Sequence, residues 1–246
     1  MKRFLVALGF SLGMFIHTSF GDAHFQSGPA RTSLLELFTS EGCSSCPPAE
    51  ARLSRLKDDP GLWKRFVPVA YHVDYWDRLG WRDRFASPDF TARQHRYATL
   101  WQSESVYTPA FVLDGKELRG GLTESLPTGP AAGVLDAQSE NGKNWAVSFR
   151  PAAKERGEFE AHVALLGAGI SLKIDAGENG GRNLQHDFVV LSQENAALAP
   201  AGNQLAASLT TPAPTEKAPR QAVAIWVTRR GELTPVQATG GWLAKK

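Results

Sequence analysis

The chain has 246 residues, of which 42% are hydrophobic and 21% charged, a balance typical of a folded globular protein of one or two domains. Its formal net charge is only +2, from 27 lysines and arginines against 25 aspartates and glutamates. A dedicated nucleic-acid-binding protein would carry a strongly basic face. The near-neutral balance argues against that class, so we expect no nucleic-acid partner.

The N-terminal segment 1–21 has the pattern of a secretory signal peptide. Two basic residues precede an uncharged apolar run over residues 4–16, and small residues follow. That run is too short to span a bilayer and has the length of a signal-peptide core. We expect cleavage after Gly21 or Ala23, a periplasmic or secreted mature protein, and no membrane span after cleavage.

The next predicted unit is a strand, a helix and a second strand. Residues 32–38 form an apolar run of the kind buried on both faces of a parallel sheet. A helical pattern follows over 49–57 and ends before the Pro-Gly pair at 60–61. The apolar run over 67–73 is the second strand. This order predicts parallel pairing of the two strands through a right-handed crossover.

Two further elements follow in this region. Ser87-Pro88-Asp89 has the residue types of a helix start, and three aromatic residues then recur on one helical face, which indicates core packing. Asp114-Gly115 between two apolar runs predicts a hairpin. Thr108-Pro109 stands at the front of the first hairpin strand, and the sequence permits a cis bond there without showing it.

The composition shifts after residue 125, where prolines, glycines and small residues lead up to Asn141. A short helix is expected at 131–138. Beyond Asn141, short apolar runs alternate with turn-rich segments, which predicts a small β-sandwich. We therefore expect two domains, at 30–141 and 142–246.

Cys43 and Cys46 are the only two cysteines, and Ser44 and Ser45 separate them at the junction of the first strand and helix. Three interpretations are open. In the first, the pair is redox-active. Cys43, at the exposed entry to the helix, is then the attacking thiol, favoured as a thiolate by unpaired backbone N–H groups, and Cys46 is the resolving thiol. The second is a structural bridge, although closing so short a loop stabilises a fold by only about 2 kcal/mol.

The third interpretation is a copper-binding metallochaperone with Cys43, Cys46 and His72 as ligands, because copper accepts thiolate and imidazole. The redox interpretation needs no cofactor and no metal, and His72 would instead tune the cysteine pKa or pass a proton. Asp74 and Trp76 follow the second strand. The carboxyl ends of parallel strands share one edge of a sheet, so these residues are expected at the same rim as the dithiol, as contacts for a partner.

The order of strand, Cys-x-x-Cys, helix, strand, helix, Thr-Pro and hairpin resembles the thioredoxin superfamily. The chain is more similar still to an exported thioredoxin-like family known only as a domain of unknown function. That resemblance is carried by Leu37–Pro48, His72–Asp77 with Gly80-Trp81, Tyr107–Pro109, and Gly177–Asn179 through His186-Asp187.

The resemblance implies an α/β thioredoxin-like N-terminal domain followed by a small all-β sandwich-like C-terminal domain. It implies that Pro109 is a cis proline facing the dithiol and that Thr108 contacts the substrate backbone. Gly42 is a departure, because ordinary thioredoxins carry tryptophan before the first cysteine. Ser44 and Ser45 can each offer a hydroxyl to the thiolate, which would favour the reduced form and make a stronger oxidant.

The leading hypothesis is an exported thiol–disulfide oxidoreductase that acts on thiols or disulfides of other exported proteins. The alternatives are the copper metallochaperone and a non-enzymatic interaction module with a structural disulfide. The candidate site residues are Cys43, Cys46 and Pro109 for catalysis and Thr108, His72, Asp74 and Trp76 for substrate binding.

Overall fold

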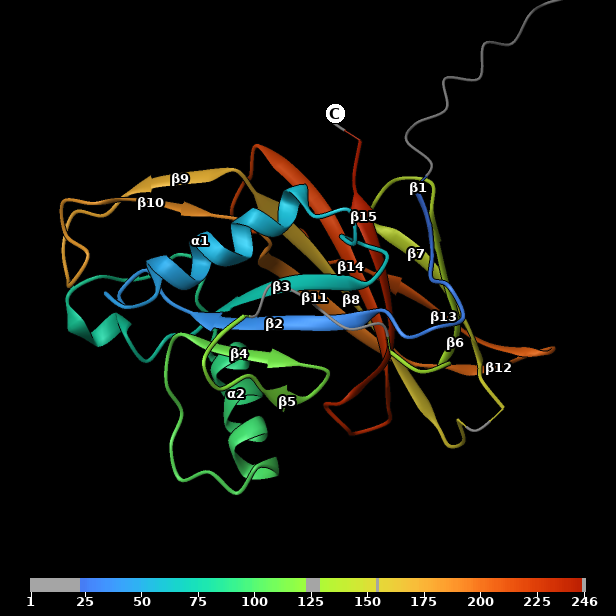
Figure 1. Ribbon diagram of the computed structural model, residues 1–246. Helices are drawn as coiled ribbons and strands as arrows, with labels where there is room; N and C mark the ends of the chain where they lie inside the picture. The colour runs from blue at the N-terminus through green and yellow to red at the C-terminus, as the bar shows by residue number, and fades with distance from the viewer. Residues whose placement is uncertain (1–22, 123–128, 154, 245–246) are drawn as a thin grey trace, which may run out of the picture.

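The computed structural model describes residues 23–122, 129–153 and 155–244, so the predicted signal peptide at 1–21 lies outside the described residues. Over the described part the chain is mostly β, with fifteen strands in three sheets, two α-helices and two short 3-10 helices. The expected α/β thioredoxin-like domain followed by a separate small β domain is therefore wrong. Strands from both halves of the chain join one large sheet (Figure 1).

The large sheet has eight strands in the order β15-β14-β8-β11-β3-β2-β4-β5. In that order the strands are Pro235–Trp242, Arg220–Arg229, Phe159–Ala168, Val189–Ala197, Phe66–His72, Ser33–Thr39, Ala110–Leu113 and Lys116–Glu117. Four of them precede residue 141 and four follow it.

A short parallel pairing joins the two halves of this sheet. Val189 at the start of β11 pairs with Ala70 of β3, and the N–H of Ala70 donates to the carbonyl of Phe188. Beyond that point β11 pairs antiparallel with β8. The prediction failed because the short apolar runs after residue 141 were assigned to a closed sandwich, whereas β11 extends the first sheet. The expected division at 30–141 and 142–246 stays a prediction.

The local elements of the first half follow the sequence closely. Strands β2 and β3 pair in parallel in register, as expected for the strand–helix–strand unit, and α1 (Pro47–Arg55) lies between them in the chain. A 3-10 turn, η1 (Leu56–Asp58), ends that helix, and a second, η2 (Asp77–Leu79), follows β3. Helix α2 (Pro88–Leu100) begins as predicted. In Figure 1, α1 and α2 lie on opposite sides of the part of the sheet formed by β3, β2 and β4.

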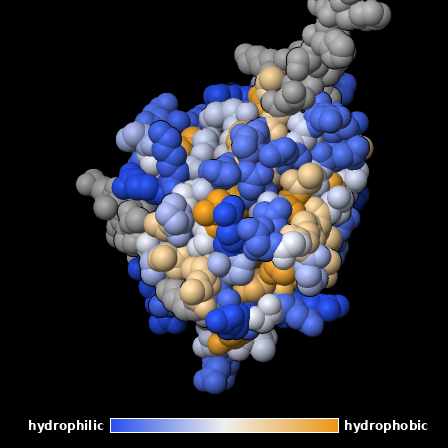
Figure 2. All heavy atoms as spheres, turned by 90° about the vertical axis from the view of Figure 1, so that its right-hand side faces the viewer, coloured by the Kyte–Doolittle hydropathy of each residue, from blue (hydrophilic) through white to orange (hydrophobic). Residues whose placement is uncertain are grey.

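A second layer of antiparallel strands packs against the C-terminal half of the large sheet. Its order is β1-β6-β7-β13-β12, and a separate hairpin pairs β10 with β9. The five strands are Ala23–Gln26, Gly133–Ser139, Asn144–Pro151, Gln204–Thr210 and Ala199–Ala201, and the hairpin strands are Asn183–His186 and Ile170–Lys173. Figure 2 shows the side of the molecule where the five-stranded sheet lies, with mainly hydrophilic residues between small apolar patches.

The side chains of β14 point alternately into two different hydrophobic cores. Val223, Ile225 and Val227 point into the core beneath the five-stranded sheet. Ala224 and Trp226, on the opposite face, belong to the core that contains α1 and α2. Side chains in a strand point to alternate faces, so this one strand contributes to both cores.

The helix expected at 131–138 is wrong, because β6 occupies that segment and pairs antiparallel with β7. Gly133, Leu135 and Ala137 are buried and the residues between them are partly exposed, a period of two that suits a half-buried strand. Within the described residues, no helix is long and apolar enough to cross a membrane.

A buried ion pair joins α2 to β2 of the large sheet. Glu36 lies in the apolar run of β2 and has no exposed surface. Arg93 Nε donates to Glu36 Oε2 at 2.6 Å, and the Tyr97 hydroxyl donates to Glu36 Oε1. Phe90, Tyr97 and Trp101 pack in the same core, as the aromatic spacing indicated.

Removing one partner of this pair will destabilise the protein strongly. Glu36→Gln leaves the Arg93 guanidinium buried without its counter-charge, so we expect the free energy of unfolding to fall by about 3–5 kcal/mol. Urea denaturation monitored by circular dichroism measures this loss. Exposed Glu104→Gln, on the loop after α2, is the control. The double variant Glu36→Gln/Arg93→Met should recover part of the loss, and a single variant as stable as wild type would contradict the assignment.

Candidate functional site

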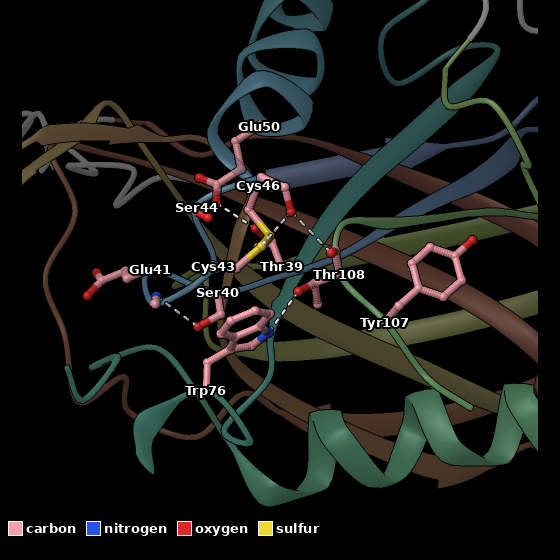
Figure 3. The surroundings of a disulfide bond; sticks show 12 residues. Thr39, Ser40, Glu41, Cys43, Ser44, Cys46, Glu50, Trp76, Tyr107 and Thr108 are labelled. Carbon is pink, nitrogen blue, oxygen red and sulfur yellow. Dashed lines mark hydrogen bonds between the residues drawn. A yellow bond between two sulfur atoms is a disulfide. The ribbon is translucent and has the colours of Figure 1, made fainter. Parts of the chain in front are cut away.

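Cys43 and Cys46 form a disulfide in the turn between β2 and α1, as Figure 3 shows. Their Cα atoms are 5.4 Å apart. Cys46 immediately precedes the helix, and its carbonyl accepts hydrogen bonds from the N–H groups of Ala49 and Glu50. The pair predicted from the spacing in the sequence is therefore bonded, at the strand–helix junction where it was expected.

Neither sulfur is exposed in this state. Cys43 and Cys46 each have 0% exposed surface, whereas Ser44 and Ser45 between them are exposed. The expectation of an exposed Cys43 is therefore wrong for the disulfide form. One reason is local: the hydroxyl of Ser45 folds back to lie 3.3 Å from Cys43 Sγ.

A second reason lies far along the chain. The loop between β9 and β10 reaches the cysteine turn, and Asn179, fully buried, donates from Nδ2 to the carbonyls of Glu41 and Cys43 at 2.8 and 3.0 Å. Beside it, Glu178 Oε2 accepts a hydrogen bond from the N–H of Ser44. The hairpin thus fixes the backbone on both sides of Cys43.

The helix start offers few N–H groups to a Cys43 thiolate. Pro47 and Pro48 occupy the first two helical positions and have no N–H. The N–H of Cys46 donates to the carbonyl of Cys43, and that of Ser44 is bound to Glu178. Unpaired backbone N–H groups would therefore stabilise a Cys43 thiolate less than the sequence predicts. The Ser45 hydroxyl, 3.3 Å from Cys43 Sγ, is a hydrogen-bond donor next to that sulfur.

Thr108 lies beside the cysteine turn, and its bond to Pro109 is cis. Ser45 Oγ donates to the carbonyl of Thr108 at 3.5 Å, and Trp76 Nε1 donates to Thr108 Oγ1 at 2.8 Å (Figure 3). The structure thus brings Trp76 and Thr108 to the rim of the cysteine turn, where the sequence placed them.

The position of Trp76 explains why a residue without a side chain precedes Cys43. A Cβ atom on Gly42 would lie 3.0 Å from Trp76 Cβ, closer than ordinary van der Waals contact. The tryptophan from the segment after β3 packs where a side chain at position 42 would stand. Gly42 therefore lets this aromatic residue approach the cysteine turn.

Asp74 and His72 are each bound to other side chains. Asp74 Oδ1 accepts a hydrogen bond from Thr91 Oγ1 at 2.6 Å, which ties the loop after β3 to α2. His72 is buried, and its Nδ1 lies 2.7 Å from Asp83 Oδ2. In the free protein, therefore, Asp74 anchors a loop and His72 belongs to a buried polar cluster.

That cluster contains five buried ionisable side chains: Glu41, Glu50, His72, Asp83 and His186. His186 Nδ1 is hydrogen-bonded to Glu50 Oε2, and Thr39 Oγ1 donates to Glu50 Oε1 at 2.6 Å. Trp81 Nε1 donates to Glu41 Oε2 at 2.6 Å. The two imidazole rings lie edge to face with centroids 5.3 Å apart.

The residues of this cluster shift one another's pKa values. Burial alone would lower the pKa of His72, but the neighbouring carboxylates, Asp83 above all, raise that pKa to about 9. Burial alone would raise the pKa of Asp83, yet the charge and hydrogen bond of His72 hold it below its usual range. Burial and the charge of Asp83 raise the pKa of Glu41. The cluster therefore favours a positive charge among its carboxylates.

Sequence reasoning missed most of this cluster. Glu41 and His186 stand in stretches that carried the family resemblance, but no role was assigned to them. Glu50 lies one helical turn beyond Cys46 and Asp83 lies in a mixed-charge segment, and neither position gives a distinctive signal. Only the fold places them beside His72.

Two hollows on the surface lie elsewhere. The larger has a volume of about 750 Å³ and is lined by residues from α2, β8 and β11 with the loops around 212–216 and 231–233. The other lies beside β1 and β7. Neither is lined by the cysteine turn or by Thr108.

The fold and site define a mostly β protein with a short-loop disulfide above a buried imidazole–carboxylate cluster. A family model described as "Protein of unknown function (DUF1223)" matches residues 34–228, and the chain belongs to that family. This confirms the expected family of unknown function; its thioredoxin-like character stays a prediction. A search of curated proteins gives no match.

Two solved structures share the fold. Protein AGR_C_4864 from Agrobacterium tumefaciens is 23% identical, with a TM-score of 0.60 over 87% of this chain and 94% of that chain. HBP35 of Porphyromonas gingivalis is 14% identical, with a TM-score of 0.54 over 87% of this chain and 76% of that chain. At these identities the likeness concerns the fold alone.

Loss of the Asn179 side chain will loosen the cysteine turn. Asn179→Ala removes the donor to two buried carbonyls, so we expect unfolding to become easier by about 1–3 kcal/mol and reduction of the disulfide by dithiothreitol to become faster. Denaturation and thiol-release kinetics measure the two effects. Gln185→Ala, an exposed position on the same hairpin, is the matched control and should change neither. Unchanged reduction kinetics in Asn179→Ala would show that the hairpin does not protect the disulfide.

Proposed function

We propose that this protein is an exported thiol–disulfide exchange protein, with Cys43 and Cys46 as its redox pair. The observation that carries the proposal is the disulfide itself. It closes over only two residues at a strand–helix junction, with a serine hydroxyl 3.3 Å from the sulfur of Cys43. A bridge over so short a loop adds little stability through chain entropy, which favours a chemical role.

The exchange proceeds in two steps. A substrate thiolate attacks Cys43 Sγ, the Cys43–Cys46 bond breaks, and Cys46 leaves as a thiolate while a mixed disulfide forms. A second substrate thiol then attacks the mixed disulfide and releases Cys43, so the substrate is oxidised by two electrons and the pair is reduced. The reverse sequence reduces a substrate disulfide.

Access to Cys43 requires a small movement of the turn that covers it. Ser44 and Ser45 are exposed, and rotation of the Ser45 side chain removes the hydroxyl that lies against the sulfur. The same hydroxyl can donate to Cys43 once that residue is a thiolate, which lowers the energy of the reduced state. In this proposal Ser45 covers Cys43 Sγ in the disulfide form and donates a hydrogen bond to the Cys43 thiolate in the reduced form.

The residues around the pair would bind the substrate chain. Thr108 and Pro109 lie at the rim, Trp76 holds the Thr108 side chain, and Thr108 has a carbonyl that Ser45 now contacts. The proposed kinship with the thioredoxin superfamily rests on this local order of Cys-x-x-Cys and Thr-Pro, not on the overall fold. Asp74 and His72 stay predicted contacts, and in the free protein their polar groups bind Thr91 and Asp83.

A structural disulfide in a non-enzymatic interaction module is the second candidate. The observation that favours it is the complete burial of both sulfurs. No such observation favours the copper metallochaperone built on Cys43, Cys46 and His72, because both sulfurs are bonded to each other.

Trapping of mixed disulfides separates the two candidates. In Cys46→Ala the resolving thiol is absent, so Cys43 should accumulate mixed disulfides with glutathione and with exported proteins. Mass spectrometry of the protein purified without reductant detects these adducts, and Cys43→Ser is the matched control that should form few. Absence of adducts, together with no glutathione or insulin exchange by the wild type, would overturn the redox proposal and leave the structural disulfide.

The hydroxyl of Ser45 should make the pair more oxidising. A hydrogen bond to a charged group contributes about 1.5–3 kcal/mol, and 30 mV corresponds to about 1.4 kcal/mol for a two-electron couple. Ser45→Ala should therefore shift the reduction potential by roughly 30–60 mV to more negative values, measured by equilibrium titration with glutathione. Ser44→Ala is the control and should shift it little. Equal shifts in both variants would remove the specific role of Ser45.

A further inference from the structure

Behind the disulfide, the five residues of the buried cluster carry an excess of negative charge. Glu41, Glu50 and Asp83 are carboxylates, and His72 and His186 are the only bases beside them. Within the described residues, no lysine or arginine forms an ion pair with any of the five. Three carboxyl groups thus share two imidazoles, and protons or a metal ion must balance the negative charge that the carboxyl groups carry. Buried charge of this kind is stable only when it is paired or when it coordinates a metal.

Each imidazole of the cluster has one nitrogen bound to a carboxylate. His72 Nδ1 lies 2.7 Å from Asp83 Oδ2, and His186 Nδ1 is bound to Glu50 Oε2. Metal-binding histidines in proteins are oriented in this way, with the second nitrogen directed to the ion. Asp83 is held in turn by the N–H groups of Glu41 and Phe85, so the orientation of His72 is fixed by a buried network.

Three buried polar atoms at this place have no hydrogen-bond partner among the described residues. They are His72 Nε2, His186 Nε2 and Glu41 Oε1, and both histidines are 99% buried. In the neutral imidazole whose Nδ1 donates to a carboxylate, Nε2 holds a lone pair, and a carboxylate oxygen is an acceptor too. A cation that displaces the proton of such an imidazole would give these unpartnered atoms a ligand role.

We propose that Glu50, His72 and His186 bind one first-row transition-metal dication, of which Zn²⁺ is the representative. One ligand atom of each of these residues lies within 4.8 Å of the other two. Two imidazoles and one carboxylate are a donor set of zinc sites that keep a fourth position. Glu41 Oε1, 3.8 Å from His186 Nε2, provides the nearest additional oxygen.

The ligand atoms need to move only a little. Metal–ligand bonds of about 2.0–2.2 Å place neighbouring ligand atoms roughly 3.3 Å apart, so the present group contracts by about 1 Å or more when the ion binds. Any proton on the ligating nitrogen of His72 or His186 is released to solvent when the ion binds. Asp83 keeps its contact with His72 Nδ1 throughout.

This site does not depend on the proposed thiol–disulfide exchange. It uses no cysteine and shares only His72 with the copper site considered from the sequence, where Cys43 and Cys46 were the other ligands. It also departs from the expectation that the leading hypothesis needs no metal. Binding can therefore be tested on the oxidised protein, in which both sulfurs are bonded and cannot coordinate the ion.

The test is Zn²⁺ binding by the oxidised protein, followed by calorimetry and by metal analysis after gel filtration. Because the cluster is buried, Zn²⁺ is supplied both to the native protein and during refolding. We expect one Zn²⁺ per chain and a thermal unfolding temperature that rises with Zn²⁺. His186→Gln and His72→Gln should abolish both effects. Asp83→Asn, which leaves the ligands in place, should weaken binding by 10–100-fold.

Two controls make the outcome decisive. His24→Gln removes an exposed histidine beside Asp136 and should bind Zn²⁺ as the wild type does. Cys43→Ser/Cys46→Ser should also retain the ion. Circular dichroism identifies any variant that fails to fold, and Asp83→Asn and Glu50→Gln then replace it. No bound Zn²⁺ in either arm, or equal binding by folded variants of His72 and His186, would overturn the proposal.

Discussion

The removal of water from five ionisable side chains is the constraint on which this part of the structure depends. Glu41, Glu50, His72, Asp83 and His186 are all nearly inaccessible to solvent. A buried charge costs several kcal/mol unless other groups compensate it, so each of these residues must be matched to the others in position. The turn before α1, the end of β3, the loop after it and the end of β10 are therefore held to one geometry.

That constraint explains why the chain brings its distant segments together. The β9–β10 hairpin is not part of either large sheet, yet it supplies His186 to the cluster and Asn179 to the carbonyls around Cys43. The parallel contact of Val189 with Ala70 follows within three residues of His186 and places that hairpin over α1. The junction between the halves of the sheet and the buried cluster are thus parts of one arrangement.

Local patterns in the sequence predicted local structure well and long-range structure poorly. Ser87 caps α2 by accepting from the N–H of Asp89, and Asp114-Gly115 turns the β4–β5 hairpin, because both signals act within a few residues. The pairing of β11 with β3 depends on contacts across more than 100 residues, which no short period records. The sequence shows Glu36 only as one residue of an apolar run. Its ion pair with Arg93 becomes visible only in the folded structure.

The same limit applies to the site. The Cys43–Cys46 spacing left a redox pair, a structural bridge and a metal site open, and the structure contains the disulfide. Trp76 and Thr108 meet at its rim, where Trp76 Nε1 donates to Thr108 Oγ1. Burial of Cys43 was unpredictable, because the covering hydrogen bonds come partly from Asn179, 136 residues away. The sequence singled out His72, but its contacts with Asp83 and His186 exist only in the folded structure.

The disulfide and the cluster beneath it cannot be electrostatically independent. Glu50 lies beside Cys46 in Figure 3, one helical turn further along α1. A thiolate on Cys46 would add negative charge next to buried carboxylates and is disfavoured, whereas Cys43 has the Ser45 hydroxyl as a donor. In the reduced protein the negative charge should therefore reside on Cys43, the sulfur that attacks in the proposed exchange. A dication held by Glu50, His72 and His186 would offset part of the negative charge of these carboxylates and make a thiolate on Cys46 less unfavourable.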